Sequence, residues 1–76
     1  MVRIIYHREK CIGCNGCVEA APERWRISKR DGRSHLIEGK AKKGIYQVLV
    51  SDEEYEANVR AAVNCPARII KVEQVP

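Results

Sequence analysis

Three cysteines stand at an even spacing of three near the start of the chain, as Cys11, Cys14 and Cys17 of the run CIGCNGC. Thiolates at this spacing, in a loop that contains two glycines, can wrap around a compact inorganic core with their sulfur atoms converging on it. Three thiolates are an incomplete ligand set, so the fourth must come from elsewhere in the chain. Cys65 is the one cysteine left in the sequence. The pattern therefore predicts a metal centre with four thiolate ligands.

Two other uses of these cysteines fit the spacing less well. A four-cysteine zinc site pairs two C-x2-C halves with two ligands from each, whereas here the split is three and one. A thioredoxin-like C-x-x-C motif would open a helix of a larger α/β domain, and it would leave Cys17 and Cys65 unexplained. The spacing thus favours an iron–sulfur centre over zinc and over thiol redox chemistry.

The run CIGCNGCVEAAP with a distant Cys-Pro resembles the bacterial-type ferredoxins, specifically those with a single 4Fe-4S cluster. In this comparison Ala21 stands where the ligand of a second cluster would be, and Cys65 stands where a ligand returns to the first. Some relatives carry aspartate at the position of Cys14 and hold a three-iron cluster, so cysteine here implies four irons. The resemblance, which covers nearly the whole chain, implies one 4Fe-4S cluster held by Cys11, Cys14, Cys17 and Cys65.

The same resemblance implies a function and its partners. It indicates a one-electron carrier that passes low-potential electrons between redox enzymes, is not itself an enzyme, and acts as a monomer without nucleic acid or membrane. An alternative from another class stays open. In this alternative, the metal centre is structural or regulatory, and a basic hairpin binds the partner. The centre would then be a cluster or, less readily, a four-cysteine zinc site.

Size and composition agree with a small metalloprotein. At 76 residues the chain is expected to form one domain, residues 1–76, and a chain of this size buries only roughly 60% of its unfolded surface, so it needs a staple. No stretch reaches the ~20 apolar residues of a membrane span, and the N-terminus lacks the apolar region of a signal peptide. These features predict a cytoplasmic location, where thiols stay reduced and metal ligation is favoured over disulfides.

The chain carries a formal charge of +4, from 14 Lys and Arg against 10 Asp and Glu. One interpretation of the basic side chains is a docking surface for an acidic partner. The interleaved acids Glu23, Asp31 and Glu38 favour instead an ordinary solvated hairpin, and nucleic-acid binding lacks the aromatic platforms it needs. The basic residues gather on one hairpin and the following loop: Arg24, Arg26, Lys29, Arg30, Arg33, Lys40, Lys42 and Lys43.

The predicted fold is α+β, a ferredoxin-like two-layer βαββαβ domain with a cluster-binding loop. In its first half we expect a strand over 2–6, a loop over 11–16, and a short helix over 17–21 that Pro22 ends. The Asp-Gly pair within KRDGR predicts a hairpin over about 25–37.

The second half is expected to begin with a polar loop over 38–44 and an extended segment over 45–50. A helix should start near residue 52, with Ser51 and Glu54 forming a capping box. Its predicted buried face consists of Tyr55, Val59, Ala62 and Val63, which follow helical spacing. Pro66 should halt the helix, and a last strand is expected over 68–73.

An ordinary structural role is expected for two aromatic residues and for both histidines. Tyr6 and Trp25 are expected to pack in the core, although the ring of Tyr6 is close enough in sequence to Cys11 to cover a cluster. His7 and His35 are expected to be surface or strand residues, because four thiolates already complete the ligand set.

Overall fold

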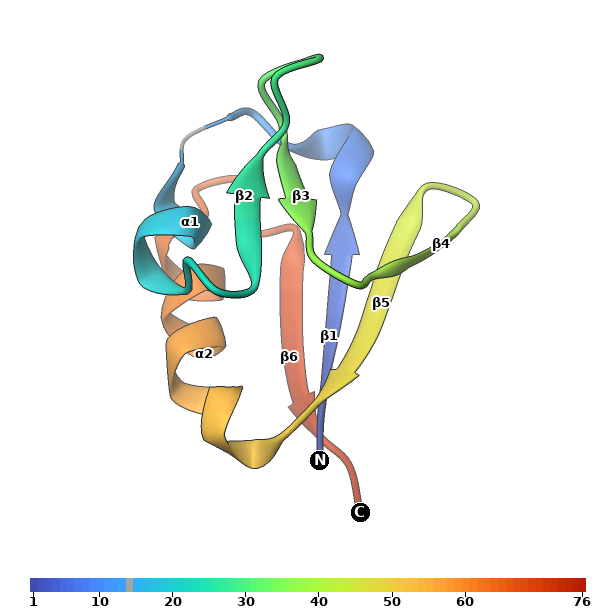
Figure 1. Cartoon of the computed structure of the whole chain (residues 1–76), viewed down its shortest axis with the longest axis vertical. Helices are drawn as coiled ribbons and strands as arrows, with labels where there is room; N and C mark the ends of the chain where they lie inside the picture. Colours follow the sequence, from blue (N-terminus) through green and yellow to red (C-terminus); the bar gives the residue numbers. More distant parts are fainter. Residues whose placement is uncertain (14) are drawn as a thin grey trace.

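The computed structural model describes residues 1–13 and 15–76, arranged as strands and two helices (Figure 1). This mixed strand-and-helix fold agrees with the predicted class. The bounds of the elements in chain order are β1 (Val2–His7), the 3-10 turn η1 (Arg8–Lys10), α1 (Gly16–Ala20), β2 (Trp25–Ile27), β3 (Ser34–Leu36), β4 (Lys40–Lys42), β5 (Ile45–Val50), the 3-10 turn η2 (Asp52–Glu54), α2 (Tyr55–Asn64) and β6 (Ile70–Gln74).

Two antiparallel sheets organise these elements. The larger has the strand order β4-β5-β1-β6, so that the first and last strands of the chain are neighbours, and the smaller is the β2-β3 hairpin. Helices α1 and α2 pack against each other, and α2 also packs against β6. The predicted hairpin over 25–37 is confirmed. The described residues contain two strands more than the predicted order βαββαβ, because β4 and β5 join the central sheet.

The core lies between the inner face of the large sheet and the layer formed by the hairpin and helices. Alternate residues of β1, Val2, Ile4 and Tyr6, are fully buried, as expected for a strand with one face covered. Trp25 is also fully buried, and its ring meets that of Tyr6 edge-on, with centroids 4.8 Å apart. The prediction that both aromatic residues pack in the core is confirmed.

Strand β4 replaces part of the loop that was predicted over 38–44. Lys43 and Gly44 both have positive φ, 54° and 82°, and Lys42 pairs with Ile45 across them. Two such residues form the tight turn whose twist matches that of an antiparallel hairpin. The prediction was wrong because Lys-Ala-Lys has little strand propensity of its own, whereas the Lys-Gly turn folds it back onto β5.

The start of the long helix differs from the predicted capping box. Ser51 makes no side-chain cap bond, and η2 precedes α2. The carboxylate of Glu54 instead accepts two hydrogen bonds from the guanidinium of Arg24, at Nε–Oε1 and Nη2–Oε2 distances of 2.9 Å. A bidentate pair with a charged donor is stronger than a cap bond to a backbone amide. Glu54 therefore ties the hairpin to the helix.

The buried face of α2 also differs from the prediction. Val63 is 78% exposed, and the residues fully covered are Asn58 and Ala61. Asn58 accepts a hydrogen bond from Trp25 Nε1 at 2.8 Å and donates to the Glu54 carbonyl at 2.8 Å. Hydrophobic spacing assigns asparagine to the exposed side of a helix, so the predicted buried face is rotated away from the observed one.

Within the described ranges, no helix is long and apolar enough to cross a membrane.

Candidate metal centre

The predicted ligands sit where irregular segments meet helix ends. Cys11 directly follows η1 and is half-buried, Cys17 lies in the first turn of α1, and Cys65 is the residue after α2. The side chains of Cys17 and Cys65 are 4% and 7% exposed and belong to the apolar core. Cys14 lies outside the described residues.

Ser34 connects two of these cysteines. Its backbone N–H donates to Cys11 Sγ at 3.3 Å, and its side-chain Oγ lies 2.9 Å from Cys17 Sγ. Because a thiolate is only an acceptor, the Ser34 hydroxyl donates whenever Cys17 is deprotonated. Ser34 is 1% exposed, and its carbonyl accepts a hydrogen bond of 2.8 Å from the Tyr6 hydroxyl. Both donor groups of Ser34, its backbone N–H and its side-chain hydroxyl, therefore contact cysteine sulfur atoms.

A close contact between the two helices places Cys17 and Cys65 at one junction. A Cβ on Gly16 would come within 3.0 Å of both Asn64 Cβ and the Asn64 carbonyl oxygen. The Asn64 amide also donates weakly to the Gly16 carbonyl, at 3.4 Å. Gly16 immediately precedes Cys17, and Asn64 immediately precedes Cys65. The absence of a side chain at Gly16 thus lets the two cysteine-bearing helix ends approach each other.

A second close approach holds the cysteine loop against the hairpin. Gly13 has φ of 76°, and a Cβ there would lie 2.7 Å from the Gly32 carbonyl oxygen. Both the left-handed backbone and the lack of space require glycine at this position. The loop that carries Cys11 is therefore packed on the same hairpin that supplies Ser34.

The surroundings of Cys11 favour its thiolate. Burial of the Cys11 thiol raises its pKa, but hydrogen bonds, the strongest of them from the Ser34 backbone amide, outweigh this and hold the pKa below its usual value. Burial is also the main reason that the pKa of Tyr6 is raised, followed by its contact with Cys11, so the phenol stays neutral. Since the thiolate is the form that binds metals, these hydrogen bonds favour the ligand form of Cys11.

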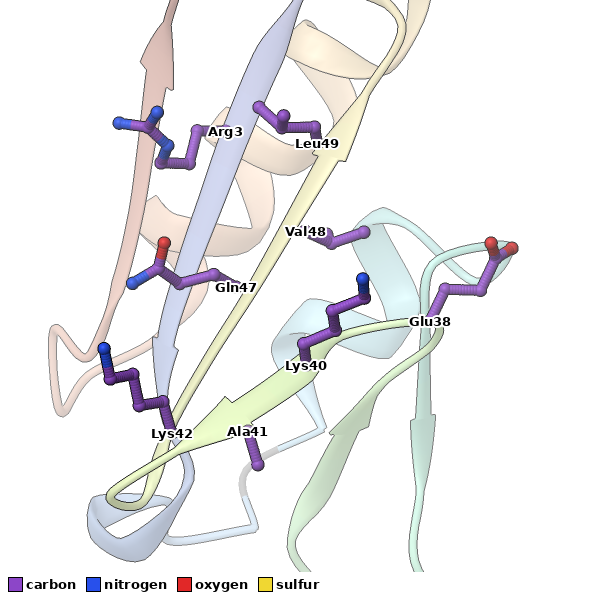
Figure 2. A pocket seen from close by; sticks show the side chains of 8 residues that line it. All are labelled: Arg3, Glu38, Lys40, Ala41, Lys42, Gln47, Val48 and Leu49. Atoms are coloured by element: carbon purple, nitrogen blue, oxygen red, sulfur yellow. The ribbon is translucent and has the colours of Figure 1, made fainter.

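The structure brings Cys11 and Cys17 together at Ser34, and the residues just before Cys17 and Cys65, Gly16 and Asn64, contact each other. Across residues 1–13 and 15–76, no three His, Cys, Asp or Glu side chains gather closely enough to hold a metal ion. A surface hollow of about 830 Å³, lined by β4, β5 and β1 residues such as Lys40, Val48 and Arg3, contains none of the cysteines (Figure 2). That hollow is therefore not the candidate centre.

A family model described as "4Fe-4S single cluster domain" matches residues 4–72 of the chain. The chain belongs to this family. The match contains every cysteine of the sequence. No curated protein sequence matches the chain.

Several solved structures share the fold over almost the whole chain. Ferredoxin 1 of Hydrogenobacter thermophilus is 21% identical with a TM-score of 0.76, over 99% of this chain and 100% of that one. A 3Fe-4S ferredoxin associated with CYP194A4 from R. palustris HaA2 is 24% identical with a TM-score of 0.68, over 95% and 97% of the two chains. Ferredoxin I of Desulfovibrio africanus is 25% identical with a TM-score of 0.61, over 99% and 100%. Family and fold together make this chain a ferredoxin-like iron–sulfur protein of electron transport.

The described residues fit an iron–sulfur group. Cysteine sulfur atoms are the donors that such groups use, and the N–H and O–H of Ser34 are aimed at two of them. Outer hydrogen bonds of this kind orient the ligands and tune the centre that they hold. The apolar packing of Cys17 and Cys65 restricts water.

Sequence reasoning missed Ser34 as a functional residue. The signal was present, because alternation along β3 places Ser34 on the same side as the fully buried Leu36 and opposite to His35. A polar residue on the buried side of a short strand requires a partner, and here the partners are the two cysteines. His7 and His35 are partly buried residues of β1 and β3, and Arg24 is a part-buried cation that pairs with Glu54 and donates to the Ile37 carbonyl.

Proposed function

We propose that the protein is a one-electron carrier whose single domain, residues 1–76, holds one 4Fe-4S cluster. The ligands are Cys11, Cys14, Cys17 and Cys65. The contact that carries this proposal is that of Ser34 with the sulfur atoms of Cys11 and Cys17, in a chain whose family is defined by a single cluster. The junction of Gly16 with Asn64 supports Cys65 as the remaining ligand.

When bound, the cluster supplies reversible one-electron redox chemistry at low potential. The chain's own residues do the rest. The cysteines bind the cluster and join the N-terminal loop to the end of α2, which closes the chain and gives a small domain the staple that its size requires. Ser34 donates hydrogen bonds that offset the negative charge on ligand sulfur, and the apolar core around Cys17 and Cys65 excludes water.

The protein acts between redox enzymes and is not itself an enzyme, a proposal that its match to a 4Fe-4S single cluster family supports. That one relative of similar fold is associated with CYP194A4 supports an oxidoreductase as partner. We further propose that the carrier works as a monomer in the cytoplasm.

Anaerobic reconstitution with iron and sulfide tests the proposal. The expected product contains four irons and four sulfides per chain, absorbs broadly near ~400 nm and bleaches with dithionite. A product with three irons would contradict the four-iron assignment. A colourless product that binds zinc and has no redox response would contradict the carrier function and favour a structural metal site.

A further inference from the structure

A cationic groove lies beside the candidate metal centre, between η1 and the β2-β3 hairpin. It has a volume of about 660 Å³. We call it the arginine groove and define it by the charged side chains and the histidine that line it: Arg8, Arg26, Lys29, Arg30, Asp31 and His35.

The positive charge of this groove is largely unneutralised. Arg8 pairs with Asp31, the one carboxylate in the lining, with Nη1–Oδ2 and Nη2–Oδ1 distances of 2.7 and 3.2 Å. That pairing is the main reason that the pKa of Asp31 is lowered, so this carboxyl stays ionised and paired. In the part of the chain that the structure describes, no carboxylate lies within ion-pair distance of Arg26, Lys29 or Arg30. These three cations are therefore available to an anionic partner.

The groove shares its walls with the metal centre. The carbonyl of Arg8 accepts a hydrogen bond from the Cys11 N–H at 3.1 Å. On the hairpin side, His35 follows Ser34, which contacts the sulfur atoms of Cys11 and Cys17. A partner seated in the groove would therefore lie against the turn that precedes Cys11 and the strand whose Ser34 contacts Cys11 and Cys17.

The charge distribution along the molecule would orient such a partner. The acids Asp52, Glu53, Glu54 and Glu56 gather at the start of α2, which lies at the opposite end of the long axis from the hairpin tip (Figure 1). A molecule with separated positive and negative ends turns its positive end toward a negatively charged partner before contact. Here that end carries the hairpin tip and the groove beside it.

We propose that electrons are exchanged through the arginine groove, and that the redox partner docks there with an acidic face. This inference rests on the proposed carrier function. The rival docking surface is the hollow in Figure 2, where Arg3, Lys40 and Lys42 also present cations. The groove is favoured because its lining residue Arg8 accepts a hydrogen bond from the Cys11 backbone, and its lining residue His35 directly follows Ser34 in β3.

Two charge-reversal variants test which of the two surfaces binds the partner. Arg26→Glu with Arg30→Glu alters the groove, and Lys40→Glu with Lys42→Glu alters the rival hollow by the same net charge at exposed positions. The first readout is the affinity of the cluster-loaded protein for a short poly-L-glutamate, a mimic of an acidic face, measured by calorimetry at low ionic strength. This readout requires no electron transfer.

The second readout is the rate at which the reduced protein is oxidised by the trianion tris(oxalato)cobaltate(III) and by the trication hexaamminecobalt(III). In each reaction one electron leaves the protein and reduces cobalt(III) to cobalt(II), with no proton transferred. The groove variant should lower the poly-glutamate affinity and the trianion rate by about tenfold and raise the trication rate, while the control changes each by less than about threefold.

Equal changes in the two variants would overturn the proposal, because they would report net charge alone. Larger changes in the Lys40 and Lys42 variant would also overturn it and place the docking surface at the hollow of Figure 2. Failure of the carrier function is recognised separately, as the lack of a reducible iron–sulfur chromophore in the unmodified protein; the poly-glutamate comparison is then made between the same variants without a cluster.

Discussion

The hydroxyl of Ser34 lies 2.9 Å from the sulfur atom of Cys17, in a pocket where Ser34 is 1% exposed and Cys17 is 4% exposed. A hydrogen bond to a thiolate sulfur stabilises the more negative state of the group that the sulfur binds. Because the contact is buried, water cannot replace the hydroxyl at full strength when it is removed. Ser34 is therefore expected to set part of the reduction potential.

Replacing Ser34 with alanine removes this donor and keeps the backbone N–H that contacts Cys11. The reduced state should lose about 1 kcal/mol of stabilisation relative to the oxidised state, which lowers the reduction potential by about 40 mV. Protein-film voltammetry measures this shift. The matched control is Ser51→Ala, since Ser51 is exposed and makes no side-chain cap bond. A potential unchanged in Ser34→Ala, or shifted equally in both variants, would contradict the role of Ser34.

Alanine substitutions at two glycines distinguish the cost of backbone strain from the cost of a steric clash between the cysteine loop and the hairpin. Gly13 and Gly32 have similar positive φ, 76° and 72°, but a Cβ would clash only at Gly13. Gly32→Ala should cost about 1 kcal/mol from its left-handed backbone, and Gly13→Ala should cost more because the loop must also move away from the hairpin. Thermal unfolding and the rate of iron loss to a chelator measure the difference. Equal losses in the two variants would show that the contact of the loop with the hairpin is unimportant.

The buried pair of Trp25 and Asn58 predicts a coupled effect on stability. Asn58→Ala leaves the Trp25 indole N–H without its acceptor, which should cost about 1–3 kcal/mol of unfolding free energy beyond the lost packing. In a Trp25→Phe background that N–H is absent, so the same substitution should cost less. Denaturant unfolding of the four members of the cycle measures the coupling. Additive effects would mean that the hydrogen bond contributes nothing to stability.

Local patterns were sufficient to predict the elements whose signals lie within a few residues. The Asp-Gly pair located the hairpin, the β-branched and aromatic run over 2–6 located β1, and Pro66 ended α2 before Cys65. The even spacing of cysteines also identified the correct family. Each of these signals acts through backbone geometry or ligand chemistry that does not depend on the rest of the fold.

Apart from β4, which the Lys43-Gly44 turn folds back onto β5, the failures involve polar residues whose partners are distant in sequence. Glu54 pairs with Arg24 instead of capping α2, Asn58 is buried because Trp25 needs an acceptor, and Ser34 is buried because two cysteines lie above it. The burial and pairing of these residues are determined by tertiary contacts between segments, whereas hydrophobic spacing alone assigns the residues to the surface.

Iron retention by a Cys65→Ala variant tests the central claim most directly. The account predicts that this variant, reconstituted beside the unmodified protein, fails to retain four irons and lacks the EPR signal of the reduced unmodified protein, whereas Asn64→Ala, altered one residue away, keeps both. A Cys65→Ala variant with full iron content and an unchanged reduced EPR signal would contradict the assignment of the fourth ligand and, with it, the single cluster that closes the chain.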